Sequence, residues 1–152
     1  STDPQEAEVV VGCDSMLEIA GQVVGKPADA AQARERWRMM SGGTGTLHTG
    51  HFLVRTADGT TAEGVSSATI RFGSPSPAEV EAYIASGEPL WCAGAFTIDG
   101  LGGAFIEGID GDPHGVVGIS LPLLRRLLAT LGVVWTDLWA PPPATKPVDD
   151  AH

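Results

Sequence analysis

The stretch Thr46–Phe72, "TLHTGHFLVRTADGTTAEGVSSATIRF", decides the fold class of this sequence. It reads as two long strands that meet at Asp58-Gly59, a dipeptide common in the tight turns of hairpins. The sequence therefore predicts a long hairpin as its largest regular element.

The residues before the hairpin predict a strand, a small hairpin and a helix. Glu8–Cys13, "EVVVGC", is a short apolar run rich in valine, as expected of a strand buried on both faces. Met16–Pro27 alternates around Ala20-Gly21 and predicts a small hairpin. Asp29 can cap a helix of good helix formers, which Ser41–Gly43 ends.

The residues after the hairpin predict two more helices with a strand between them. Ser76 and Glu79 form a capping box for a helix that ends at Gly87. A segment dense in glycine follows, in which 104–109, "AFIEGI", should be a strand. Residues 120–132 close the pattern as an amphipathic helix.

Strands interleaved with helices, plus one long hairpin, predict an α/β or α+β domain with a mixed sheet and flanking helices. We expect one domain over residues 1–139. Residues 140–152, "APPPATKPVDDAH", are rich in proline and predict a disordered tail.

Charge and composition limit the partners. The 152 residues carry a formal net charge of -10, which argues against a nucleic-acid polymer or an anionic membrane as partner. One phosphorylated ligand is still compatible, since a few local cations and a metal ion can hold it. Neither a membrane span nor a signal pattern is present, so we expect a cytoplasmic protein. The two cysteines, Cys13 and Cys92, should be reduced thiols.

Asp14 and Lys26 are the first candidates for chemistry. Asp14 follows the apolar strand, where it could hold a divalent cation or accept a proton from water, or could equally cap a turn. Lys26, in Gly-Lys-Pro, is the only lysine before the tail. It could present its ammonium to a phosphate, or be a solvated lysine at the end of a hairpin.

Three other patterns predict no site. Residues 41–50, "SGGTGTLHTG", lack the lysine of a phosphate loop and follow a helix instead of preceding one. His48 and His51 should point to opposite faces of a strand, which makes a poor metal pair. The arginines at positions 34, 36 and 38 predict a solvated helix face.

Acidic residues gather in and around the glycine-dense segment. As a group they could bind a cation or recognise donors on a base, although each alone is typical of a surface or turn position. The group consists of Glu88, Asp99, Glu107, Asp110 and Asp112.

Five motifs in order resemble the Maf family of nucleoside triphosphate pyrophosphatases, first described as septum-formation inhibitors. They are "VVVGCDS", "GKP", "MSGGTGTLHTG", "EAYIASGEPLWCAGAFTIDGLG" and "IDGDPHGVVGISLPLL", and they run from about Val9 to Gly132. The resemblance implies an elongated, two-lobed α/β fold with a central cleft, related to the inosine triphosphate pyrophosphatases. It also implies hydrolysis of a nucleoside triphosphate to the monophosphate and pyrophosphate with Mg²⁺ or Mn²⁺, and a link to cell division.

The resemblance assigns roles to four residues. The family's proton acceptor for the attacking water falls on Asp14, which we also expect to contact the metal. Its phosphate-binding lysine falls on Lys26, and two positions associated with substrate choice fall on Ser15 and Asp99. The sequence around Cys92 and Asp99 is more similar to that of the branch that acts on 7-methylguanosine triphosphate than to that of the pyrimidine branch. A modified purine nucleotide is therefore the favoured substrate, and a second copy of the chain, in a homodimer, is a further candidate partner.

One feature of the family has no match here. Its members open with a strand and a Ser-x-Ser-Pro-Arg-Arg loop that grips the triphosphate, followed by a helix and a further acid, and nothing in this sequence matches them. We expect either a fragment or a chain that has lost the loop and turns over weakly or not at all. The alternatives to an enzyme are a non-catalytic regulator of cell division that binds a nucleotide or a partner, and an inactive truncated domain.

Overall fold

The computed structural model describes residues 8–139, so the predicted tail lies outside the described residues and the single domain over 1–139 stays a prediction. The five strands form one sheet in the order β2-β1-β3-β4-β5. Their bounds are Val9–Ile19 for β1, Gln22–Val24 for β2, Thr44–Arg55 for β3, Thr61–Phe72 for β4 and Ile106–Gly111 for β5. The predicted domain of one sheet with flanking helices is confirmed.

One detail of the sheet differs from the prediction. We expected a mixed sheet, but every strand pairing within residues 8–139 is antiparallel. Tight turns join β1 to β2 and β3 to β4, and a tight turn can only produce antiparallel neighbours.

The turns of the two predicted hairpins have the backbone that their sequences require. In the β1–β2 turn, Ala20 and Gly21 both have positive φ, 50° and 79°. Positive φ at both central residues is the mark of a type I′ turn, whose twist matches that of the flanking strands. In the β3–β4 turn, Gly59 has a φ of 71°. Both hairpins are confirmed.

The helices begin at their predicted caps. Helix α1 spans Ala30–Met40, and the Asp29 side chain accepts the N–H of Gln32 at 2.8 Å. Helix α2 spans Pro77–Ala85 behind the Ser76 capping box, and α4 spans Leu121–Thr130 behind Ser120. The remaining helical segments are α3 at Pro113–Val117 and the 3-10 turns Glu88–Trp91, Ala93–Ala95, Leu101–Phe105 and Trp135–Leu138. None of the helices in the described residues is long and apolar enough to cross a membrane.

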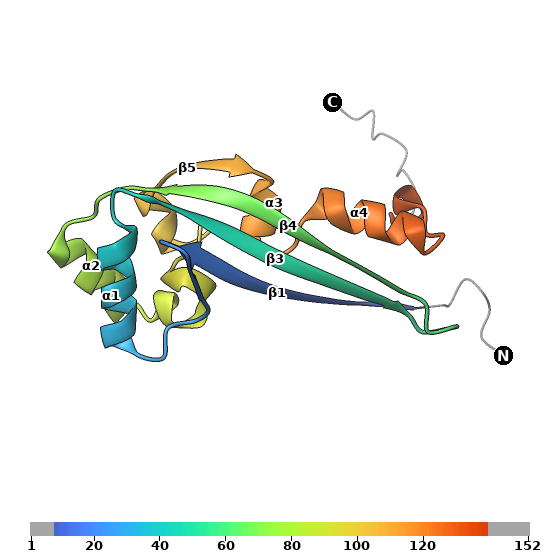
Figure 1. Cartoon of the computed structure of the whole chain (residues 1–152), viewed down its shortest axis with the longest axis horizontal. Coiled ribbons are helices and arrows are strands. Elements are labelled where there is room, and N and C mark those ends of the chain that lie inside the picture. The colour runs from blue at the N-terminus through green and yellow to red at the C-terminus, as the bar shows by residue number, and fades with distance from the viewer. Residues whose placement is uncertain (1–7, 140–152) are drawn as a thin grey trace, which may run out of the picture.

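Two apolar clusters cover one face of the sheet. The first joins Leu17, Leu47 and Ile70 of the strands to Trp37 of α1. The second joins Leu53 to the leucines of α4. Figure 1 shows α1 and α2 at one end of the long strands and α4 toward the other end. This division agrees with the two-lobed fold that the family resemblance implies.

The other face of the sheet is open, which contradicts the prediction of a first strand buried on both faces. Val10 and Val65 on this face are 54% and 64% exposed, and Met16 and Phe52 are also exposed. The helices of residues 8–139 pack against the opposite face only. Along the outer edge of β1, the described residues supply β2 alone, which pairs with Leu17–Ile19.

The type I′ turn makes a prediction about stability. Replacing Ala20 by glycine should raise the free energy of unfolding by about 0.5–1 kcal/mol, because the left-handed conformation costs an L-residue about 1–2 kcal/mol and glycine's extra chain entropy offsets part of the gain. Gly21→Ala is the matched control and should lower the free energy of unfolding by about 1 kcal/mol. Urea denaturation measures both changes, and a destabilised Ala20→Gly variant would contradict the turn.

Candidate active site

A cavity of about 190 Å³ gathers three of the residues that the sequence singled out. Ser15 enters it from β1, whereas Cys92 and Asp99 enter it from the glycine-dense segment. Leu47 and Phe96 of the first apolar cluster also line the cavity. The structure thus brings together the two positions predicted to select the substrate.

The hydroxyl of Ser15 is oriented by a chain of hydrogen bonds. Thr49 on β3 donates its hydroxyl proton to the carbonyl of Gly115 at 2.9 Å. The Ser15 and Thr49 hydroxyls are 3.0 Å apart, so Ser15 must be the donor between them, since Thr49 has no second proton. The free lone pairs of Ser15 can therefore accept a hydrogen bond. Because the Asp99 carboxylate is also an acceptor, the cavity suits a ligand edge that carries donors.

The charges of Lys26 and Asp99 both act on the thiol of Cys92. Burial raises the pKa of the Cys92 thiol, the charges of Glu88 and Asp99 raise it further, and the charge of Lys26 lowers it. Lys26 itself is exposed and does not line the cavity. Its charge thus acts on the cavity lining from a residue outside the lining.

Buried Arg36 holds the loop that carries Lys26. The Arg36 guanidinium donates to the carbonyl of Gly25, which also accepts the N–H of Gly94 at 3.3 Å. This contact ties the Lys26 loop to the segment after Cys92. Arg36 is buried, and burial lowers its pKa, so the prediction of a solvated face is wrong at this position. Arg38 is exposed and Arg34 is partly exposed, in line with the prediction.

Glu88 closes the loop that carries Asp99. Its carboxylate accepts the backbone N–H of Leu101 at 3.1 Å and of Gly102 at 3.0 Å. Burial opposes the ionisation of Glu88, but hydrogen bonds from Tyr83 and from these N–H groups outweigh it, so the pKa of Glu88 lies below its ordinary value. Burial, followed by the contact with Glu88, raises the pKa of Tyr83. Glu88 is therefore a positioning residue for the loop.

Two other acids of the predicted group, Asp110 and Asp112, have separate partners. Asp110 pairs with Arg71 at 2.9 Å, and Asp112 caps α3 and accepts the hydroxyl of Ser120. Within residues 8–139, no group of three or more His, Cys, Asp or Glu side chains could enclose a metal ion. The acids therefore do not form one cation site among themselves.

The two histidines of β3 lie on opposite faces, as predicted. His48 contacts Glu18 and Ser67 on the open face. His51 is buried beneath the helices, where its Nε2 accepts the N–H of Ser120 at 2.8 Å. Its Nδ1 then donates to the carbonyl of Thr49 at 3.0 Å.

Asp14 lies outside the cavity, on the open face of the sheet. Adjacent residues of a strand point to opposite faces, so Asp14 and Ser15 diverge. Asp14 lines a broad hollow of about 780 Å³ with Phe52, Glu63 and Val65. Opposite Asp14 on β3 stands Gly50, which leaves the carboxylate uncovered. The outer edge of β1 at Asp14 and Ser15 has no strand partner within the described residues.

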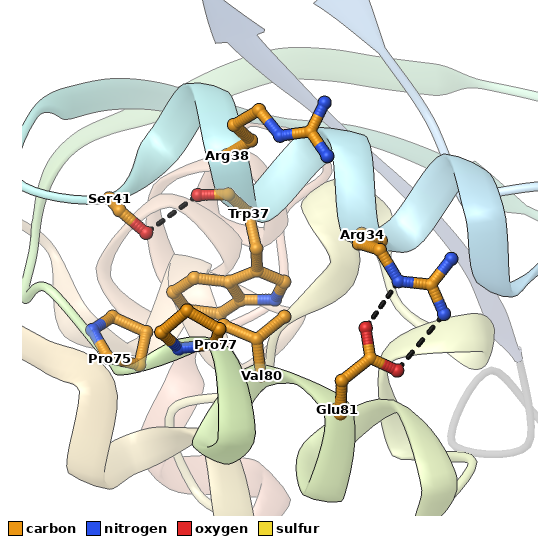
Figure 2. Close-up of a pocket in the computed structure, with 8 residues that line it drawn as sticks. All are labelled: Arg34, Trp37, Arg38, Ser41, Pro75, Pro77, Val80 and Glu81. Atoms are coloured by element: carbon orange, nitrogen blue, oxygen red, sulfur yellow. Dashed lines mark hydrogen bonds and ion pairs between the residues drawn. The ribbon is translucent and has the colours of Figure 1, made fainter.

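A further groove, between α1 and α2, contains none of these residues. Figure 2 shows its wall of Trp37, Pro75, Pro77 and Val80, with the Arg34–Glu81 ion pair at its rim. The polar groups drawn there are largely occupied: Arg34 contacts Glu81 through two nitrogens, and Ser41 donates to the carbonyl of Trp37 at 2.6 Å. We assign this groove to the packing of the two helices.

Sequence reasoning missed the roles of Thr49, Glu88 and Arg36. Thr49 could have been found, because it has the same strand parity as Leu47 and so should point inward. The partners of Glu88 and Arg36 are 13 and 11 residues away in the chain, and no local pattern identifies them.

The role of Glu88 predicts a pH dependence of stability. Its ionised form should stabilise the fold above the ordinary glutamate pKa of 4.5, and this contribution should be lost as the pH falls through the lower pKa of the folded state. Glu88→Gln should therefore lower the melting temperature most at neutral pH and least in acid. Thermal melts between about pH 7 and pH 3 measure this difference. Glu107→Gln on β5 controls for net charge, and a difference from the parent that is constant over this range would contradict the role of Glu88.

Comparison of the sequence with known proteins gives its family. The sequence profile described as "Maf: Maf-like protein" matches residues 1–131. The "Nucleoside triphosphate pyrophosphatase" of Streptomyces coelicolor is 56% identical over 133 residues, which are 88% of this chain and 65% of that protein. The protein of the same name from Salinispora tropica is 56% identical over 139 residues, 91% of this chain and 62% of that protein.

A third relative is a fusion. The "Nucleoside triphosphate pyrophosphatase/Nudix hydrolase fusion protein" of Bifidobacterium longum is 52% identical over 138 residues, 91% of this chain and 29% of that protein. The chain thus spans less than two thirds of the length of these curated relatives. The profile match over most of its length nevertheless shows that the chain belongs to the Maf-like protein family.

Proposed function

We propose that this chain carries the base-selecting and water-activating groups of a nucleoside triphosphate pyrophosphatase. The observation that carries the proposal is the cavity that joins Ser15 and Asp99, with the charge of Lys26 acting on Cys92 in the same lining. The names of the relatives support the same reaction, in which a nucleoside triphosphate yields the monophosphate and pyrophosphate.

The acceptors in the cavity favour a purine of the guanine type. Guanine presents neighbouring N–H donors on its Watson–Crick edge, whereas uracil and thymine present one N–H between two carbonyl acceptors. Asp99 and Ser15 both accept hydrogen bonds, which matches the first pattern better than the second. A modified guanine nucleotide is our proposed substrate.

The edge of β1 explains how one nucleotide could use groups on both faces of the sheet. We place the base in the cavity with Ser15 and the phosphates across the edge toward Asp14, with Lys26 offsetting phosphate charge. Asp14 then accepts the proton lost by the attacking water. Water attacks the α- or the β-phosphorus, and the bond from that phosphorus to the bridging oxygen breaks. The bridging oxygen keeps the electron pair and leaves with the other phosphorus, and the water oxygen stays on the phosphorus that it attacked, so atoms balance.

The residues present fit a divalent cation brought by the substrate better than a resident one. Mg²⁺ keeps several waters and binds through one or two carboxylates together with substrate phosphates. The exposed carboxylate of Asp14 suits such a role, and no larger ligand cluster occurs among residues 8–139. A bound Mg²⁺ or Mn²⁺ would neutralise phosphate charge at Asp14.

Asp14→Asn tests the proposed base. The variant keeps the shape of the side chain but cannot accept the proton, so pyrophosphate release should fall by about 10²–10⁴-fold. Glu63→Gln is the matched control, because it removes a carboxylate from the same hollow and should retain most activity. The assay measures pyrophosphate release with Mg²⁺ from canonical and methylated triphosphates. Unchanged turnover in Asp14→Asn would remove this role, and nucleotide binding without any turnover in the parent would favour the non-catalytic regulator.

Asp99→Asn tests the selection of the base. Asparagine adds an amide donor and removes the charge, so the preference in kcat/KM for guanosine over uridine triphosphate should fall about ten-fold or more. Asp137→Asn removes the same charge from an exposed position outside the cavity and should leave the preference unchanged. An unaltered preference in Asp99→Asn would exclude Asp99 from contact with the base.

A further inference from the structure

We infer that Trp91 stacks on the nucleobase and is a specificity-determining residue that favours a cationic purine ring over a neutral one. The inference rests on the proposed function, because it uses the same cavity. Trp91 lines this cavity together with Ser15 and Asp99, yet its side chain is 76% exposed. Trp37, by contrast, is buried in the first apolar cluster.

The turn that carries Trp91 is fixed by contacts of its three other residues. Trp91 ends the 3-10 turn Glu88–Trp91, whose first residue is held by the N–H groups of Leu101 and Gly102. Pro89 is fully buried, and Leu90 packs against the first apolar cluster. The exposed indole therefore stands on a fixed backbone, so a ligand that packs against it orders little of the chain.

The lining of the cavity is chemically suited to a flat ring. Besides Trp91, its lining includes Val117 of α3, which is also exposed. The polar side chains of Ser15, Thr97 and Asp99 also line it. A volume of about 190 Å³ can hold one purine ring system but not a whole nucleoside triphosphate. Apolar surface with a few convergent polar groups is what a nucleobase needs, because its faces are apolar and its edge is polar.

The charges around Trp91 favour a ring that carries positive charge. The face of an indole is the negative part of its quadrupole and attracts a cation. Asp99 adds a carboxylate to the same lining, and the charges of Glu88 and Asp99 both raise the pKa of neighbouring Cys92. The one opposing charge, that of Lys26, has the smallest effect on this thiol, so the balance of charge here is negative. Methylation at N7 gives guanine such a charge, so the 7-methylated ring should bind more tightly than the unmodified one.

The test measures binding of monophosphates, which does not depend on turnover. The probes are 7-methylguanosine monophosphate, guanosine monophosphate and ribose 5-phosphate, titrated by calorimetry into the whole chain. Trp91→Ala should weaken binding of the methylated nucleotide about ten-fold or more and reduce its advantage over guanosine monophosphate. Trp91→Phe should retain most of the affinity, and binding of ribose 5-phosphate should not change.

Trp139→Ala is the matched control, because Trp139 is 67% exposed and does not line the cavity. Intrinsic fluorescence gives a second readout: 7-methylguanosine monophosphate should quench the parent and Trp139→Ala but quench Trp91→Phe much less. Equal affinity of the parent and Trp91→Ala for the methylated nucleotide would overturn the inference, and so would a parent that binds none of the base-containing probes. Trp91-dependent binding in a chain that releases no pyrophosphate would uphold the inference and overturn the proposed reaction.

Discussion

The backbone pairing of β1 with β3 is the constraint on which the candidate site depends. This register sets Ser15 opposite Thr49 and Asp14 opposite Gly50. Strand alternation then sends Ser15 under the helices and leaves Asp14 on the open face. The Thr49 hydroxyl orients Ser15, and the absence of a side chain at Gly50 leaves Asp14 accessible.

A second set of contacts brings distant loops to this strand. Arg36 holds the backbone before Lys26, Glu88 closes the loop around Asp99, and the indole N–H of Trp37 donates to Ala95 at 2.8 Å. Two of these contacts involve a charged group bonded to backbone, and such hydrogen bonds contribute about 1.5–3 kcal/mol each. The cavity is therefore shaped by a few strong polar contacts, two from α1 and one from the 3-10 turn Glu88–Trp91.

Local signals predicted the elements of this fold well. Asp58-Gly59, Ala20-Gly21 and the Ser76 capping box act through neighbouring residues, so the sequence alone could identify them. Burial depends on what packs from elsewhere, which is why Val10 and Arg36 were predicted wrongly. The same limit applies to the site. Motif order predicted Asp14, Ser15, Lys26 and Asp99 as site residues, and the extension of β1 to Ile19 shows that the first two face apart.

The divergence of Asp14 and Ser15 has an evolutionary consequence under the proposed assignments. Substitutions at Ser15 or Asp99 alter the surface that meets the ring and leave the opposite face of the strand untouched. Selection could therefore change which nucleotide is removed from the cell while the hydrolytic step is inherited intact. Under these assignments, position 14 would stay conserved while the neighbouring position 15 varies with the substrate.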